Sequence, residues 1–385
     1  MIPYGRQEIT QEDIDAVVEV LRSDFLTQGP KVPEFERSIQ AYAGAVRAVA
    51  VNSATSALHL ACLALGLGPG DVLWTSPITF VASANCALYC GAKVDFVDID
   101  PCTFNLSVDA LRLKLEQAER LGTLPKIVVP VHFGGLPCDM EAIGALSRQY
   151  GFSVIEDASH AIGGMYRGMP VGSCEYSDIT VFSFHPVKII TTGEGGAAVT
   201  NDAALAEKMI LLRSHGITRD PEKMDTRPDG GWYYQQIELG YNYRMTDIQA
   251  ALGLSQMARL DKYVHGRHEI AQRYDEFLED LPLAMQHRPA ESFTAMHLYV
   301  VRLLNGQSEK THKQVFDEMR AAGIGVNLHY IPVHLQPWYK EMGFGLGDFP
   351  EAERYYTEAI SLPMYPGLNE ALQLEVVDAL NRNLA

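Results

Sequence analysis

The feature that most constrains this chain is the alternation of strand-like and helix-like segments between residues 46 and 200. Apolar runs predict strands at residues 46–51, 72–75, 94–97, 127–131, 153–156, 179–184 and 197–200. Helical patterns at residues 54–65, 81–89, 108–120 and 140–150 separate most of these strands. Strands that alternate with helices form a mainly parallel sheet with helices on both faces. We therefore expect an α/β fold, in which ligands bind beyond the carboxyl ends of the strands.

The rest of the chain predicts a second, smaller unit. Residues 215–240 are rich in charge, glycine and aromatic side chains, which indicates a long loop with a functional or partner-contacting role. The expected order after it is a helix at 246–257, a longer helix to about 281, a strand at 298–303, a helix at 311–321, a strand at 324–328 and two terminal helices. We place a large domain at residues 1–250 and a smaller C-terminal α/β domain at residues 251–385.

Charge and composition exclude two classes of partner. The formal net charge of −17 argues against nucleic acid, which needs clustered Lys and Arg, so we expect no nucleic-acid partner. Residues 48–68 carry no formal charge and are long enough to imitate a membrane span. They contain several polar side chains, however, and change from a strand pattern to a helix pattern, so we also expect no membrane partner.

The compartment follows from the first residues and from the cysteines. Residues 1–8 carry polar and charged groups where a signal peptide needs an apolar run. The six cysteines include no CxxC pair and predict buried free thiols: Cys62, Cys86, Cys90, Cys102, Cys138 and Cys174. We expect a cytoplasmic protein.

A lysine and an aspartate follow two of the predicted strands. Lys188 comes shortly after the strand at 179–184, and the glycine-rich turn 193–196 follows it. A lysine amine beside backbone that can approach a ligand closely is the arrangement that a Schiff-base enzyme needs. Asp157 directly follows the strand at 153–156, where a carboxylate can pair with a protonated pyridine nitrogen, cap a helix or bind a metal. Together the two residues suggest pyridoxal phosphate (PLP) chemistry.

The turn at residues 52–56 joins a predicted strand to a predicted helix. Free backbone amides and the positive end of the helix dipole favour an anion there, and the hydroxyls add donors. The alternative is that a Ser or Thr side chain only caps the helix. Because the turn shares its sheet edge with Lys188, we favour a phosphate site. Phe80 follows another strand end and could either stack on a flat ring or belong to the core.

No metal site is predicted. His160 is the only obvious second ligand near Asp157, and His185, His329 and His334 do not have the spacing of metal ligands. The glycine-rich stretch 66–70 follows a helix and precedes a strand, which is the wrong order for a dinucleotide-binding loop.

Four ordered segments give the chain a resemblance to a known family. They are residues 52–59, 156–161, 182–188 with 192–196, and 240–246. On these motifs the chain resembles the DegT/DnrJ/StrS family of PLP-dependent sugar aminotransferases, which have fold type I, and the resemblance covers nearly the whole chain. It implies PLP as the cofactor, a nucleotide-sugar and glutamate as substrates, and a homodimer with shared active sites.

The resemblance also implies roles for individual residues. Lys188 would hold PLP as a Schiff base, and Asp157 would pair with the pyridine nitrogen. The remaining cofactor contacts would be Ala54 (through its backbone), Thr55, Ser56 and Ser183 at the phosphate, Phe80 over the ring, His160 near the phenolic oxygen, and Asn242 at the phosphate of the neighbouring subunit's cofactor. Six residues would contact the nucleotide-sugar, with packing or loop solvation as the alternative: Tyr4, Leu26, Thr27, Gln28, His329 and Tyr330.

Three features resemble one branch of the family, the C4-aminotransferases of pseudaminic acid biosynthesis. They are residues 26–29, the Asn-Ser-Ala-Thr-Ser phosphate turn and residues 329–332, although Ala54 stands where many relatives carry glycine. This branch implies amination at C4 of a UDP-linked 4-keto-6-deoxy-N-acetyl-hexose. The alternatives are a different UDP- or dTDP-ketosugar, a non-catalytic regulator that binds a sugar or cofactor, and a PLP-dependent sugar dehydratase. Lys188 argues against the dehydratase, which carries histidine there.

Overall fold

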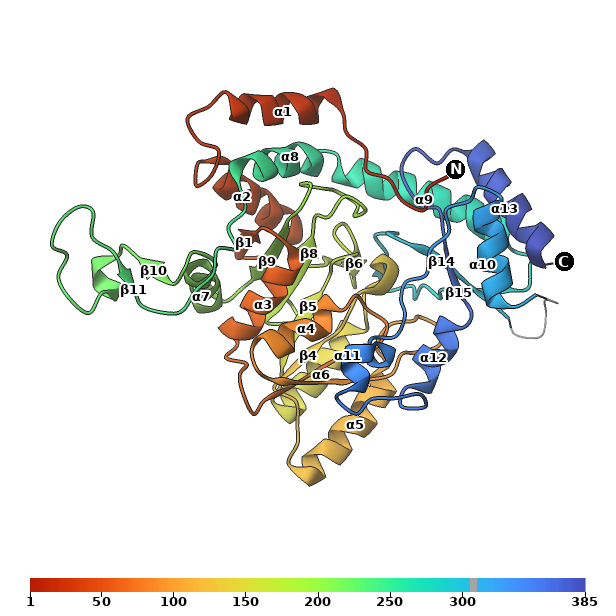
Figure 1. The fold of residues 1–385 in the computed structure, drawn as a ribbon, viewed down its shortest axis with the longest axis horizontal. Coiled ribbons are helices and arrows are strands. Elements are labelled where there is room, and N and C mark those ends of the chain that lie inside the picture. The colour runs from red at the N-terminus through yellow and green to blue at the C-terminus, as the bar shows by residue number, and fades with distance from the viewer. Residues whose placement is uncertain (305–309, 385) are drawn as a thin grey trace.

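The computed structural model describes residues 1–304 and 310–384, and its centre is a seven-stranded sheet in the order β1-β9-β8-β5-β4-β2-β3 (Figure 1). The strands are Arg47–Val51 (β1), Val72–Thr75 (β2), Lys93–Phe96 (β3), Ile127–Val129 (β4), Ser153–Asp157 (β5), Ile179–Ser183 (β8) and Gly196–Thr200 (β9). Neighbouring strands from β3 to β8 pair in parallel, whereas β9 runs antiparallel to both β8 and β1. The predicted mainly parallel α/β sheet is confirmed.

Alternate side chains of the strands face two different layers of helices, as the period of two in a strand requires. Leu73 and Val129 belong to the core beneath one layer, whereas their neighbours Trp74 and Val128 belong to the core beneath the other. The first layer contains Ala54–Ala64 (α3), Ala82–Tyr89 (α4) and Ala203–Arg213 (α7); the second contains Lys31–Ala43 (α2), Val108–Leu121 (α5), Met140–Tyr150 (α6) and Asp247–Met257 (α8). Both faces of the sheet are therefore covered, as expected.

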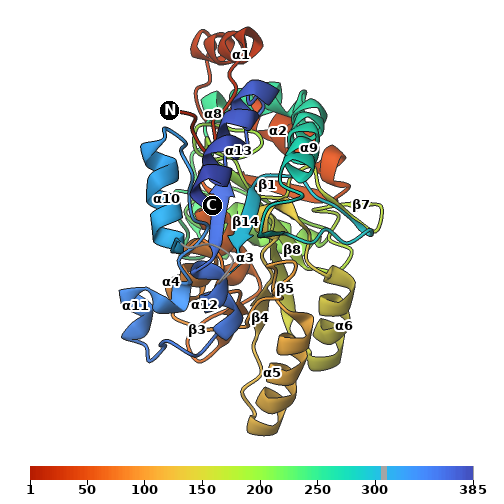
Figure 2. The same cartoon turned by 90° about the vertical axis from the view of Figure 1, so that its right-hand side faces the viewer.

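A second sheet lies in the C-terminal part of the chain, to one side of the large sheet (Figures 1 and 2). Its three antiparallel strands, in the order β12-β14-β15, are Leu283–Met285 (β12), Tyr299–Leu303 (β14) and Ala359–Leu362 (β15). The helices Leu260–Phe277 (α9), His312–Ala321 (α10) and Glu370–Leu384 (α13) share its core. Ile2 joins this core, whereas the helices Pro337–Lys340 (α11) and Pro350–Tyr356 (α12) join the core beneath α3 and α4. The domain boundary at residue 250 stays a prediction.

The strand predicted at residues 324–328 is wrong. Ile324 and Asn327 form only single bridges, to Ile2 and Ser361 respectively. The backbone amide of Gly325 donates to the carbonyl of Ile2 at 2.7 Å, so this segment threads between the N-terminal segment and β15 instead of pairing along its length. The strand that completes the sheet is β15, which lies where we expected only helices. The long helix α9 also ends at residue 277, before the expected position near 281.

The predicted loop at residues 215–240 forms an arm that projects from the body on the side opposite the C-terminal sheet (Figure 1). Two short antiparallel strands stiffen it, Ile217–Thr218 (β10) and Gln235–Gln236 (β11). Trp232 and Leu239 on this arm are each 76% exposed. The arm thus presents large apolar side chains that the chain itself does not cover.

Other elements are the helix α1 (Gln11–Leu21) and the small sheet of β6 (Met165–Tyr166), β7 (Met169–Pro170) and β13 (Ser292–Phe293).

All six cysteines are free thiols. Cys62, Cys86, Cys138 and Cys174 are buried, as expected. The expectation of burial is wrong for Cys102, which is exposed in the turn that follows β3, and for Cys90, which is only partly buried after the end of α4. Among the described residues, no helix combines the length and the apolar character that a membrane crossing requires. The cytoplasmic location stays a prediction.

Candidate active site

Three strands bring the predicted site residues to one edge of the large sheet. Strands β5 and β8 are parallel, and β1 points the same way as β8 because both run antiparallel to β9. The carboxyl ends of all three strands therefore lie at the same edge. Asp157 ends β5, Lys188 follows β8, and the 52–56 turn follows β1. The sheet thus brings the carboxylate, the amine and the turn to a common edge.

Asp157 is held from two sides. It is only 5% exposed, and it faces the α3–α4 layer of the sheet together with Ile155. The Ser83 hydroxyl on α4 donates to one carboxylate oxygen at 2.6 Å, and the Ser159 backbone amide donates to the other at 3.1 Å. The Thr79 hydroxyl lies 2.7 Å from that of Ser83. These contacts give the carboxylate a fixed direction, which a salt bridge to a ring nitrogen requires.

Lys188 is an amine in a poorly solvated place. Its backbone amide donates to the His185 carbonyl at 2.9 Å, which closes a tight turn after β8. Burial lowers the pKa of Lys188 to about 8, and the nearby Asp157 carboxylate opposes this shift. An amine whose pKa is near neutrality can lose its proton under working conditions, as a lysine nucleophile or base must.

The 52–56 turn is closely packed against the strand that follows the lysine. Ser53 caps α3 by accepting a hydrogen bond from the Ser56 amide at 3.1 Å, so the helix cap that we weighed as an alternative is present. The Ser56 hydroxyl donates to the side-chain oxygen of Asn52 at 2.7 Å. Gly196 approaches so closely that a Cβ atom there would lie 2.5 Å from the amide nitrogen of Ala54. The turn therefore caps the helix, and it can also bind an anion, because the positive end of the helix dipole lies there and Gly196 leaves the backbone amides uncovered by a side chain.

Ser183 and Thr55 complete the predicted phosphate contacts. Ser183 is paired with Gly196 in the β8–β9 ladder, and it is 7% exposed. That pairing brings it to the start of α3, where Thr55 is half-buried. The structure thus brings Ser183 next to the start of α3, and the phosphate contacts of Ala54, Thr55 and Ser183 stay predictions.

Aromatic side chains form one wall of the site. The Nδ1 atom of His160 accepts from the Gly134 amide at 3.3 Å, so Nε2 carries the proton and faces the Tyr330 hydroxyl at 3.2 Å. The rings of Tyr330 and Phe80 are 6.3 Å apart, and Phe80 is 60% exposed. Burial and the neighbouring Lys188 hold the pKa of His160 well below its usual range, so the ring is neutral. Because Phe80 is largely exposed, its ring can cover a ligand and does not fill the core.

Tyr4 and His329 lie beside this wall. Their rings are 5.5 Å apart, and the Nδ1 atom of His329 lies 2.8 Å from the Ser361 hydroxyl. Burial and Lys188 lower the pKa of His329 to about 3. His329 is therefore another neutral ring close to the amine.

Two groups of predicted residues are not joined to this cluster within one chain. The Leu26 carbonyl accepts from the Asp247 amide at 3.0 Å, and Leu26, Thr27 and Gln28 are all exposed. Asn242 is also exposed, and its backbone oxygen accepts from the Asn52 side chain at 3.4 Å. All four side chains face outward from the chain that carries them.

The sequence did not predict two residues of the site. Ser83 lies in the first turn of α4, three residues after Phe80, and its only sequence signal was a hydroxyl following a strand end. His297 gave no pattern, yet its ring centre lies 4.4 Å from that of His160, and it is 4% exposed. Its Nδ1 atom is buried with no hydrogen-bond partner in the described part of the chain. Both residues reach a predicted residue only through packing of segments far apart in sequence: Ser83 contacts Asp157, and His297 lies against His160.

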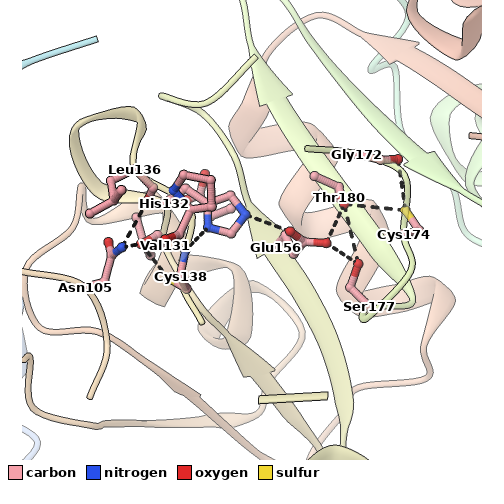
Figure 3. Close-up of polar contacts among 12 residues, drawn as sticks. Asn105, Val131, His132, Leu136, Cys138, Glu156, Gly172, Cys174, Ser177 and Thr180 are labelled. Carbon is pink, nitrogen blue, oxygen red and sulfur yellow. Dashed lines mark hydrogen bonds and ion pairs between the residues drawn. The ribbon is translucent and has the colours of Figure 1, made fainter. Parts of the chain in front are cut away.

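A separate polar network supports β5 from the opposite face (Figure 3). Glu156 points away from Asp157 and meets the Nε2 atom of His132 at 2.7 Å. Its other oxygen accepts from Thr180 at 3.0 Å and from the Ser177 hydroxyl. The backbone amide of His132 donates to the Asp157 carbonyl at 3.1 Å. The network therefore satisfies Glu156 and fixes the end of the strand that carries Asp157.

Comparison with known proteins identifies the family. Residues 7–381 match the DegT/DnrJ/EryC1/StrS aminotransferase family. The chain belongs to this family. The UDP-4-amino-4,6-dideoxy-N-acetyl-β-L-altrosamine transaminase of Campylobacter jejuni is 40% identical, over 96% of this chain and 94% of its own. The GDP-perosamine synthase of Caulobacter vibrioides is 39% identical over 96% of this chain and 95% of its own.

Solved structures agree with that assignment. Helicobacter pylori PseC, an aminotransferase of pseudaminic acid biosynthesis, superposes with a TM-score of 0.91 at 31% identity, over all of this chain and 99% of its own. Spr1654 of Streptococcus pneumoniae in its PLP form superposes with a TM-score of 0.88 at 29% identity, over the full length of both chains. Fold type I is therefore confirmed, and this member of the DegT/DnrJ/EryC1/StrS family is a PLP-dependent aminotransferase.

The residues at the sheet edge fit this cofactor. The close approach of Gly196 to Ala54 leaves the amides at the start of α3 next to Ser183, which provides donors for a phosphate. Asp157 offers a directed carboxylate for a pyridine nitrogen, and Lys188 offers an amine within its electrostatic reach. PLP requires hydrogen-bond donors for its phosphate, a carboxylate for its pyridine nitrogen and an amine that can hold it, and this edge of the sheet provides all three.

Proposed function

We propose that this aminotransferase moves the amino group of glutamate to the C4 keto group of a UDP-linked 4-keto-6-deoxy-N-acetyl-hexose. The product would be of the UDP-4-amino-4,6-dideoxy-N-acetyl-β-L-altrosamine type, in nonulosonic (pseudaminic) acid biosynthesis. The observation that carries the proposal is the placement of Lys188 and Asp157 beside the His329–Tyr330 pair, on which the resemblance to the C4-aminotransferases depends. The similarity to the Campylobacter transaminase and to PseC supports this choice of substrate.

Lys188 and Asp157 have complementary roles in this proposal. Bound PLP supplies a carbonyl group that takes up the amino group and a ring that withdraws electrons. Lys188 would hold the cofactor and then, as a neutral amine, move the proton at the α-carbon of glutamate; burial, which lowers its pKa to about 8, favours that neutral form. Asp157 would keep the pyridine nitrogen protonated, with Ser83 fixing its direction.

The aromatic wall would orient the substrates and exclude water. Tyr330 is half-buried, and desolvation together with the Asp157 charge raises its pKa, so its hydroxyl stays protonated and can donate to an oxygen of the sugar. Within the chain, the hydrogen bond between the Tyr330 hydroxyl and the Nε2 atom of the neutral His160 holds both rings in place. Tyr4 and His329 are our candidates for the sugar side of the site.

A different ketosugar is the second candidate, because the GDP-perosamine synthase is almost as similar as the altrosamine transaminase. The deciding experiment is to convert the enzyme to its pyridoxamine phosphate form with glutamate and to mix it with UDP-, dTDP- and GDP-linked ketosugars in turn. Recovery of the PLP absorbance reports amino transfer. The UDP-linked 4-keto-6-deoxy-N-acetyl sugar should restore it fastest. Faster recovery with a dTDP- or GDP-linked sugar would assign the enzyme to that substrate instead.

We further infer a homodimer in which each site takes Asn242 from the partner. Asn242 is exposed, and it lies beside the 52–56 turn of its own chain, where it can reach across an interface at this edge. The arm at residues 215–240, with Trp232 and Leu239 largely exposed, provides apolar surface for that interface. Leu26, Thr27 and Gln28, which also face outward, would meet the nucleotide-sugar in the neighbouring site.

A further inference from the structure

The ring of His297 packs against His160 at the active site. Their ring centres are 4.4 Å apart, and His297 is 4% exposed. The Nδ1 atom of His160 accepts a hydrogen bond from the Gly134 amide at 3.3 Å, and its Nε2 atom lies 3.2 Å from the Tyr330 hydroxyl. These three contacts together determine which way the His160 ring is turned.

The backbone that carries His297 is bonded to the turn that contacts His160. The Ala295 amide donates to the Gly135 carbonyl at 2.9 Å. Gly135 has a φ of +98°, and a Cβ atom there would lie 2.9 Å from the His160 carbonyl oxygen and 3.0 Å from the His297 nitrogen. Only glycine allows both this conformation and so close an approach. The turn, His160 and His297 are therefore one packed unit.

Arg267 holds the His297 backbone from α9. This helix runs from the large sheet towards the C-terminal sheet (Figure 1), and Arg267, near its middle, is 1% exposed. Its Nη1 atom lies 3.3 Å from the carbonyl oxygen of Met296 and 3.2 Å from those of His297 and Met364. Burial lowers the pKa of Arg267 to about 10. Burying a guanidinium costs free energy, and here its hydrogen bonds go to the backbone beside the site, which they fix in place.

The two histidine rings can pack together because both are neutral. Burial, His160 and Lys188 hold the pKa of His297 well below its usual range, and burial and Lys188 do the same for His160. The Nδ1 atom of His297 is buried and has no hydrogen-bond partner in the part of the chain that the structure describes. This nitrogen therefore holds neither ring, and the flat ring itself is what contacts His160.

We propose that His297, anchored by Arg267, is a positioning residue that keeps the His160 ring turned with its Nε2–H towards the cofactor site. His160 is the residue that we expect near the phenolic oxygen of PLP, where an N–H donor stabilises negative charge on that oxygen. Without the His297 ring, His160 can turn about its side-chain bonds and lose the two hydrogen bonds that direct it. The inference rests on this place of His160 and not on the choice of ketosugar.

Titration of the apoenzyme with PLP, followed by absorbance, tests the ring contact. His297→Leu removes the flat ring, so affinity for PLP should fall about threefold to tenfold, the range that one aromatic pair allows. His297→Phe keeps a flat ring and removes only the nitrogens, so it should retain the wild-type affinity. Wild-type affinity in His297→Leu, or an equal loss in both variants, would overturn the proposal.

His312→Leu is the matched control for these two variants. His312 is also partly buried, and its Nε2 atom lies 2.9 Å from the Ala359 carbonyl of the C-terminal sheet. The control removes a histidine ring and its hydrogen bond but leaves the His297–His160 contact as it is. It should bind PLP like the wild type, and a loss as large as that of His297→Leu would contradict a specific role for His297.

A double-mutant cycle tests whether Arg267 acts through His297. Arg267→Met keeps the length of the side chain and removes its donors, so affinity for PLP should again fall several-fold. Combined with His297→Leu, it should bind PLP no more weakly than the weaker single variant, because both changes release the same ring. Losses that multiply would show that the two residues act separately and would overturn the anchoring role of Arg267.

A crystal structure of the His297→Leu apoenzyme observes the result directly. The His160 ring should lose its contact with the Gly134 amide or the Tyr330 hydroxyl, whereas His297→Phe should keep both. Both contacts intact in His297→Leu would overturn the proposal, and so would wild-type PLP affinity in His160→Leu, because His160 would then not contact the cofactor. None of these measurements uses a sugar, so failure of the ketosugar assignment would leave their results unchanged.

Discussion

The Ser83 hydroxyl donates a 2.6 Å hydrogen bond to the Asp157 carboxylate, joining two residues that are 74 positions apart. The bond links α4 to the end of β5, and the Thr79 hydroxyl supports it from 2.7 Å away. Since a carboxylate can pair with a pyridine nitrogen only along certain directions, Ser83 is a positioning residue for the cofactor.

Replacing Ser83 with Ala should therefore weaken cofactor binding. A hydrogen bond to a charged group contributes about 1.5–3 kcal/mol, so we expect affinity for PLP to fall roughly tenfold or more. Titration of the apoenzyme with PLP, followed by absorbance, measures the change. Thr79→Val is the graded comparison: it removes the hydroxyl that supports Ser83 but leaves the Ser83–Asp157 bond, so it should lower the affinity less than Ser83→Ala does. Equal affinities for wild type and Ser83→Ala would show that this bond does not orient the carboxylate.

Gly196→Ala should damage the start of α3. The new Cβ atom would lie 2.5 Å from the Ala54 nitrogen and 2.7 Å from its Cα atom, and backbone cannot move aside cheaply. We expect a loss of about 1–3 kcal/mol in the free energy of unfolding, as for other overpacked sites. Urea denaturation of the apoenzyme measures it. Gly68→Ala is the control, since nothing lies within 4 Å of a Cβ there. Equal stability of the two variants would contradict the close approach.

Lys188 should make folding stability depend on pH. The pKa of Lys188 in the folded chain is about 8, below its usual 10.5, so between these values the unfolded chain binds more protons than the folded one. The cost of burying the charge is complete below pH 8 and disappears as the pH rises towards 10.5. Lys188→Met should thus stabilise the apoenzyme most at pH 7 and least at pH 10.

Urea denaturation at pH 7, 8, 9 and 10 checks this prediction. Lys340→Met, which changes an exposed lysine, is the control and should leave the pH profile as it is in the wild type. A stabilising effect of Lys188→Met that grew with pH would show that the sign is wrong.

Mixing two inactive variants tests the shared site. Lys188→Ala and Asn242→Ala should each be inactive alone, but a mixed dimer would contain one site with an intact Lys188 and a partner's intact Asn242. With random exchange of subunits, we expect recovery of about a quarter of the wild-type activity. Light scattering should show the dimer independently. If the mixture stays inactive after exchange is verified by mass spectrometry, Asn242 acts within its own chain.

The sequence could predict the residues that a strand carries to the sheet edge. In a mainly parallel sheet, strand direction alone decides which end of each strand meets the ligand, so Asp157 and Lys188 follow from two apolar runs. The helix layers follow from the same alternation. The pattern at 324–328 was misleading because the N-terminal segment occupies the place where its partner strand would be.

The contacts between elements could not be predicted in this way. Ser83 reaches Asp157 only because α4 packs across the end of β5, and His297 reaches His160 only because the segment before β14 returns to the large sheet. The exposed position of Leu26, Thr27 and Gln28 likewise depends on how the α1–α2 connection meets Asp247 at the start of α8. Such relationships depend on packing, which periodicity does not encode.

The central claim is that Lys188 holds the cofactor. Borohydride reduction of the PLP-loaded enzyme, followed by digestion and mass spectrometry, would fix the cofactor on the residue that carries it. Our account predicts the added mass on Lys188 and its complete absence in Lys188→Met. Cofactor found on any other lysine, or on none, would contradict it.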